Sequence, residues 1–149
     1  MSDLDLENNK KTPTHLWIVG IVGFLWNSMG AMDYFMTQTK NKGYMSAFTA
    51  EQLSFFYGLP TWTIATWAIA VWGGVLGTVL LLMRNKIAVP VFLASFIAMA
   101  ITSFQNFVLS NGLEVIGDTF SLLFSGVIFI AAIGFYLYSR AMLQKEILR

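Results

Sequence analysis

Four long apolar stretches alternate with short polar segments along this chain. The apolar stretches cover residues 16–36, 61–83, 87–109 and 119–139. At a rise of about 1.5 Å per residue, a helix over any of them is long enough to cross a hydrocarbon core of roughly 30 Å. The pattern therefore predicts an all-α fold in a single transmembrane domain, residues 1–149, built as an integral membrane bundle of four transmembrane helices.

The polar segments predict what lies beside the spans. Residues 1–11 carry mixed charges and few large apolar side chains, which is typical of a disordered tail. Thr49 and Gln52 form a capping box that opens a short helix, AEQLSFFY. This helix cannot cross a bilayer, so we expect it at the interface in the first extracytoplasmic loop, either anchoring the loop or covering the bundle. Residues 140–149 form a second tail that we expect to continue as an amphipathic helix.

Two residues are expected to begin long helices. Thr12 precedes Pro13, which suits an N-cap followed by proline at the first helical position. Asp118 precedes the fourth span, where its carboxylate suits both the N-cap and the positive end of the helix dipole.

The distribution of Lys and Arg predicts the orientation. With four spans, one side of the membrane holds both tails and the middle turn, and it carries seven of the nine basic residues: Lys10, Lys11, Arg84, Lys86, Arg140, Lys145 and Arg149. The other side carries Lys40 and Lys42. The positive-inside rule then places both termini in the cytoplasm.

A second interpretation of the first apolar stretch stays open. Lys10 and Lys11, the run 16–26 and the small residues at 28–30 resemble a signal peptide that is cleaved at residue 30. The acidic residues of the tail and the continuation of the apolar stretch to Met36 favour a retained span instead.

Polar side chains gather in the outer half of the predicted bundle. Asp33 lies within the first span, and a carboxylate at membrane depth is by default a hypothesis for a functional site. Gln105 falls at about the same depth of another outward-running span. We therefore predict a polar, outward-opening pocket lined by Asp33, Asn27, Gln105, Asn106, Trp26, Trp67 and Trp72. A second interpretation stays open, in which these groups only bond to one another and hold the helices together, at about 0.6 kcal/mol per pair.

Small residues predict where helices approach closely. Gly73 and Gly77 lie one turn apart in the second span, which allows a neighbouring helix to come near. In the third span, Ala94, Ala98 and Thr102 recur at nearly helical spacing, and we expect this face to point inward.

Composition excludes several kinds of function. Charged residues make up 11% of the chain, against about a quarter in soluble domains. The chain has no Cys and a single histidine, His15, which excludes thiolate sites and bis-histidine haem ligation. A net charge of +1 gives no reason to expect nucleic acid. We expect no metal, no cofactor and no enzymatic activity, because Asp33 has no second acid within the bilayer.

The runs LWNSMGAMDYFMTQ, FFYGLPTW and AVWGGVLG give the chain a resemblance to a group of proteins. It looks like small, uncharacterised four-helix bacterial inner-membrane proteins, which are often labelled "sugar transporter". The resemblance covers nearly the whole chain and implies a bacterial cytoplasmic membrane. The Pro-Gln signature of the three-helix sugar-transporting repeat is absent, and no catalytic residue is carried over.

These observations lead to two hypotheses from different classes. The first is transport or binding of a small, sugar-like polar solute. Four short spans enclose little volume, so we expect a homo-oligomer in that case. The alternative is an accessory or structural subunit of a larger membrane complex. In both, the lipid bilayer is the constant partner, and the need for Asp33 separates them.

Overall fold

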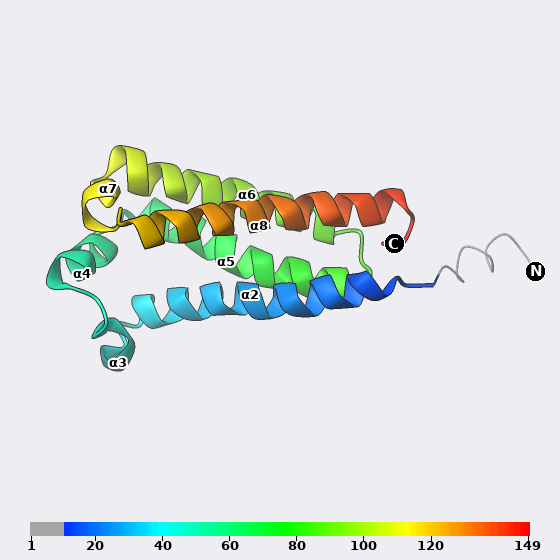
Figure 1. The fold of residues 1–149 in the computed structure, drawn as a ribbon, viewed down its shortest axis with the longest axis horizontal. Helices are drawn as coiled ribbons and strands as arrows, with labels where there is room; N and C mark the ends of the chain where they lie inside the picture. Colours follow the sequence, from blue (N-terminus) through cyan, green and yellow to red (C-terminus); the bar gives the residue numbers. More distant parts are fainter. Residues whose placement is uncertain (1–10) are drawn as a thin grey trace, which may run out of the picture.

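Four long helices run side by side in the structure, a computed structural model that describes residues 11–149 (Figure 1). The predicted disordered tail, 1–11, lies outside the described residues except for Lys11. No strand occurs within residues 11–149. Each long helix is long and apolar enough to cross a membrane, which confirms the predicted all-α bundle of four spans. They are α2 (Thr14–Gln38), α5 (Thr61–Leu82), α6 (Ala88–Phe104) with its continuation η1 (Gln105–Leu109), and α8 (Thr119–Gln144).

Both described ends of the chain lie at one end of the bundle, which we call the terminal end, and the short helices lie at the other, the loop end (Figure 1). The short helices are α3 (Lys42–Met45), α4 (Ala50–Tyr57) and α7 (Gly112–Val115). Helix α4 has the predicted bounds, and its capping box between Thr49 and Gln52 is formed in both directions. Helices α3 and α7 are single turns where the sequence predicted only loops.

The starts of two long helices test the expected caps. Asp118 is the N-cap of α8, because its carboxylate accepts a hydrogen bond from the Ser121 backbone N–H at 3.1 Å. The cap expected at Thr12 is wrong by one residue. Pro13 occupies the N-cap position, and its carbonyl accepts from the Leu16 N–H at 3.1 Å. Proline fixes its own φ near the value found there, and it makes no side-chain cap.

Each long helix packs mainly against its neighbour in the chain: α2 against α5, α5 against α6, and α6 against α8. The most extensive interface is between α5 and α6, and it includes the two glycines singled out in the sequence. A Cβ on Gly73 would lie 3.1 Å from the Ser95 Cβ, and one on Gly77 would lie 2.6 Å from the Phe92 ring. The absence of side chains at these positions is what lets the two helices meet.

The terminal end of the bundle is closed by a packed apolar cluster, made of Leu16, Leu81, Ala88, Phe92, Met142, Ile147 and Leu148. The end of the chain folds back to complete it. The Arg149 N–H donates to the Arg84 carbonyl at 2.8 Å, and the Lys86 N–H donates to the Arg149 carbonyl at 2.9 Å. Residues 140–144 continue α8 as a helix, as expected for the second tail, but residues 145–149 leave the helix, contrary to that expectation.

Candidate ligand-binding cavity

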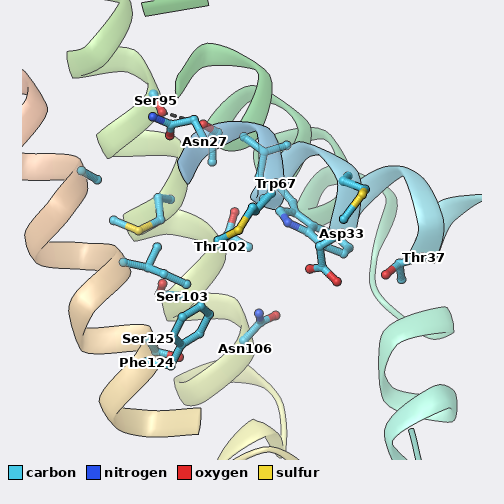
Figure 2. Close-up of a pocket in the computed structure, with 18 of the residues that line it drawn as sticks. Asn27, Asp33, Thr37, Trp67, Ser95, Thr102, Ser103, Asn106, Phe124 and Ser125 are labelled. Carbon is cyan, nitrogen blue, oxygen red and sulfur yellow. Dashed lines mark hydrogen bonds between the residues drawn. The ribbon is translucent and has the colours of Figure 1, made fainter. Parts of the chain in front are cut away.

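The loop-end half of the bundle holds a cavity of about 570 Å³ between α2, α5, α6 and α8 (Figure 2). Its inner limit is set by the ring of Phe135, which stacks on Phe92 with ring centres 5.6 Å apart. Because Phe92 belongs to the packed cluster of the terminal end, the cavity is closed on that side. It has the size of an ordinary small-molecule site, for which roughly 300–1,000 Å³ is typical.

The structure brings together five of the seven residues that the sequence predicted in this lining. Trp26, Asn27 and Asp33 come from α2, Trp67 from α5 and Asn106 from η1. Figure 2 shows the Asp33 carboxylate and the Asn106 amide reaching into the same space from different helices. The two residues therefore line one cavity, as predicted, whereas the binding of a ligand there stays a prediction.

Gln105 and Trp72 do not line the cavity, which corrects their predicted place. The Gln105 side chain is buried, and its amide donates to Ser110 Oγ at 2.9 Å, at the loop end. Gln105 opens a π-helical segment, which holds more residues per turn than an α-helix and so changes which side chain faces inward. Trp72 is 48% exposed on the outer surface of α5. An indole at the middle of a span marks depth, but it does not reveal which way the side chain faces.

Tyr44, which the sequence did not single out, is the partner of Asp33. Its hydroxyl donates to Asp33 Oδ1 at 2.5 Å. Tyr44 is placed by α3, whose N-cap Asn41 accepts from the Tyr44 N–H at 3.0 Å. Burial, and next the hydrogen bond to Asp33, raise the pKa of Tyr44 to about 12. The phenol therefore stays protonated, and remains a donor, at any physiological pH.

The polar groups deeper in the cavity already have partners on their own backbone or on a neighbouring helix. The Asn27 amide donates to the Gly23 carbonyl at 2.8 Å, and Ser95 Oγ donates to the Ala70 carbonyl at 2.6 Å. Thr102 Oγ1 donates to the Ala98 carbonyl at 2.8 Å. The donors of these three side chains therefore need no acceptor from a ligand.

Near the loop end, two side chains have acceptor oxygens that are not paired with a donor from the described residues. Asn106 Oδ1 is buried, and no donor among residues 11–149 reaches it. Asp33 accepts from Tyr44 at one oxygen and has a second acceptor oxygen, Oδ2. A buried acceptor without a donor costs about 1–3 kcal/mol. A guest that brings hydrogen-bond donors removes this cost once the Asn106 amide turns its oxygen toward the cavity.

Aromatic side chains from the loop end cover the cavity. Phe48 and Phe56 line it beside Tyr44. The rings of Phe48 and Phe56 meet edge to face with centres 5.3 Å apart, and Tyr44 lies 6.0 Å from Phe48. Helix α4 therefore contributes to the cover through Phe56, which agrees with the second of the two roles that the sequence left open.

Comparison with protein-family models, with curated proteins and with solved structures finds no match to this chain.

Proposed function

We propose that this integral membrane protein binds a small hydroxylated solute, sugar-like in its polar groups, in the loop-end cavity. The observation that carries the proposal is the pairing of acceptors in one cavity. Asp33 offers a carboxylate oxygen from α2, and Asn106 offers a buried amide oxygen without a donor in residues 11–149. Hydroxyl groups supply the matching donors, and the Trp67 ring offers an apolar face to the carbon skeleton. We assign the site no catalytic step.

We further propose that the protein transports the solute that it binds. A cavity that reaches the loop end and is closed at the terminal end suits one state of a carrier. The basic residues favour cytoplasmic termini, so the loop end would face outward. The resemblance to small bacterial inner-membrane proteins supports the cytoplasmic membrane as the location.

The test is solute binding to the purified full chain, followed by tryptophan fluorescence, because Trp26 and Trp67 line the cavity. D-glucose and glycerol are the first probes. Losing a hydrogen bond to a charged group costs about 1.5–3 kcal/mol, so we expect Asp33→Asn to weaken binding by roughly 10- to 150-fold. The isosteric amide can still accept from Tyr44, which keeps the local fold.

Asp118→Asn is the matched control, because the same change occurs at an exposed aspartate outside the cavity. Asn is as good an N-cap as Asp, so α8 should keep its start and binding should be unchanged. The proposal fails if hydroxylated solutes do not bind to the unmodified chain, or if Asp33→Asn binds them as well as the Asp118→Asn control does.

A role as an accessory subunit is the second candidate, and α8 is the observation that favours it. A Cβ added to Gly126 or to Gly134 would meet no atom within 4 Å in the described part of the chain. Such positions leave room for the backbone of a second helix to approach. Mass analysis of what elutes with the protein from a mild detergent tests this role, since a scaffold should carry a defined protein partner and should tolerate Asp33→Asn.

A further inference from the structure

The cavity is divided along its length into a polar and an apolar half. The side chains of Asp33 and Asn106 lie at the loop end (Figure 2). The Tyr44 hydroxyl donates to Asp33 there. The deeper wall comes from α5 and α8 and is apolar: Val71, Ile128, Ala132 and Phe135. The donors of this deeper half, the Asn27 amide N–H and the Ser95 hydroxyl, are already bonded to backbone carbonyls. A ligand that fills the whole space therefore needs a hydrogen-bonding head and an apolar body.

The cavity is open on its side, between α2 and α8. Three of its lining residues are also exposed on the outer surface of the bundle: Met29 at 53%, Met32 at 51% and Phe124 at 44%. Across this opening the two helices meet through few residues, among them Trp26 and Phe124, with ring centres 5.8 Å apart. For a spanning bundle this surface faces lipid, so the cavity is continuous with the hydrocarbon of one leaflet. Methionine side chains at the opening can adapt to chains of different shape.

The charge of the cavity lining limits which kinds of head group can bind. The side chains that surround the cavity include the Asp33 carboxylate, and the lining contributed by residues 11–149 has no Lys or Arg. An anionic head group would meet a like charge without compensation, which disfavours it. The groups at the loop end chiefly offer acceptors, so the head should carry several hydroxyl groups.

We propose, building on the proposed function, that the natural ligand is a neutral amphiphile with a hydroxylated head and a single apolar chain. Its head binds Asp33 and Asn106 at the loop end, and its chain lies against Val71, Ala132 and Phe135 in the deeper half. The cavity follows the helix axes, so this ligand keeps the orientation that it has in the leaflet, with its head at the interface and its chain toward the bilayer centre. It reaches the site by moving sideways between α2 and α8.

The experiment uses a series of alkyl β-D-glucosides, from methyl to octyl, each below its micelle concentration. The full chain is placed in nanodiscs of phosphatidylcholine, and binding is followed by tryptophan fluorescence. If the chain is buried in the deeper half, affinity should rise by up to about fourfold for each added methylene, until the apolar half is full.

Two variants of adjacent alanines on α8 make the result specific to the cavity. Ala132→Phe fills the apolar half, because Ala132 lines it, whereas Ala131→Phe adds the same ring to a residue that does not. We expect Ala132→Phe to lose the gain in affinity from longer chains, whatever its affinity for methyl glucoside, and Ala131→Phe to keep that gain. Because the probes enter the lipid equally with both variants, the comparison with Ala131→Phe also corrects for partition of the probes into lipid.

The outcomes separate this inference from the proposed function. If methyl and octyl glucosides bind equally to the unmodified chain, or if Ala132→Phe keeps the dependence on chain length, the amphiphile is refuted and a solute from water remains the ligand. If glucosides of every length fail to bind, the proposed function fails as well.

Discussion

The contact between Gly77 and Phe92 allows a quantitative prediction about stability. In Gly77→Ala the new Cβ would lie 2.6 Å from Cε1 and 2.7 Å from Cδ1 of Phe92. Carbon atoms pack favourably at about 3.5–4.0 Å, so the ring has to move by about 1 Å. Phe92 is 2% exposed and is stacked on Phe135, so it has little room to do so.

The size of the effect follows from overpacking, which costs about 1–3 kcal/mol in a well-packed core. Alanine also improves helix propensity by about 0.8–1.0 kcal/mol, a gain that would hide part of the loss. Gly134→Ala is the matched control, because it makes the same change within a long helix at a site where the described residues leave open space. The gain in propensity cancels between the two variants, and the difference of about 1–3 kcal/mol remains.

The assay is thermal unfolding of both variants in the same detergent, followed by tryptophan fluorescence. For a chain of this size 1 kcal/mol shifts the melting temperature by about 2–4 °C, so Gly77→Ala should melt roughly 2–12 °C below Gly134→Ala. Adding Phe92→Leu to Gly77→Ala should recover part of the loss, because a smaller side chain leaves room for the new methyl group. Equal melting temperatures, or a fully additive double variant, would refute the described packing of α5 on α6.

Four further outcomes are expected. In a chain without other cysteines, Lys42→Cys should react with an impermeant thiol reagent on intact cells, and Lys86→Cys should not; labelling of the second would reverse the topology. The absorbance of the Tyr44 phenol, identified as the signal that Tyr44→Phe lacks, should titrate near pH 12. The stability that the phenol contributes should be fully present below about pH 10 and should be lost as the pH rises through about 12. A titration midpoint near pH 10 would contradict the bond to Asp33. Hydrogen bonds from Ser121 lower the pKa of Asp118. The unmodified chain should therefore be more stable than Asp118→Ala at pH 7, and this difference in stability should be lost as the pH falls below about 4. A difference that does not depend on pH would contradict the charged cap. Thr49→Ala should lower the free energy of unfolding by about 1 kcal/mol, as judged by denaturant unfolding, and no change would mean that the capping box adds nothing.

Hydropathy and local chemistry were sufficient to predict the spans and several of their ends. The capping box at Thr49 and the N-cap at Asp118 depend on residues within one turn, and both were found from the sequence. The depth of Asp33 and Asn106 was also predictable, because depth follows from counting residues along a span.

The direction in which a side chain faces was harder to predict, because it depends on neighbouring helices. Ala94 was expected to face inward, yet Ala94 is exposed and Ser95 is buried against α5. Gln105 was misplaced for a related reason, since the π-helical segment departs from the regular period on which the prediction relied.

The partner of Asp33 was missed because it lies outside the spans. Tyr44 follows the first span in a segment that seemed to be only a polar loop, and nothing in the periodicity of that segment marks it. An aromatic hydroxyl a few residues beyond a span that contains a carboxylate was the one available signal.

The order in which the helices contact one another also bears on how the bundle assembles and opens. The extensive interfaces join helices that are consecutive among the long ones, so each can form as soon as its second helix has been inserted. The boundary between α2 and α8 joins the most distant helices in the chain and includes a hydrogen bond between His15 and Tyr138. Long-range contacts form late, and regions with few buried contacts open first. The contacts between α2 and α8 should therefore be the last to form as the bundle assembles. They should also be the first to separate, which lets the bundle open there while the other three interfaces stay intact.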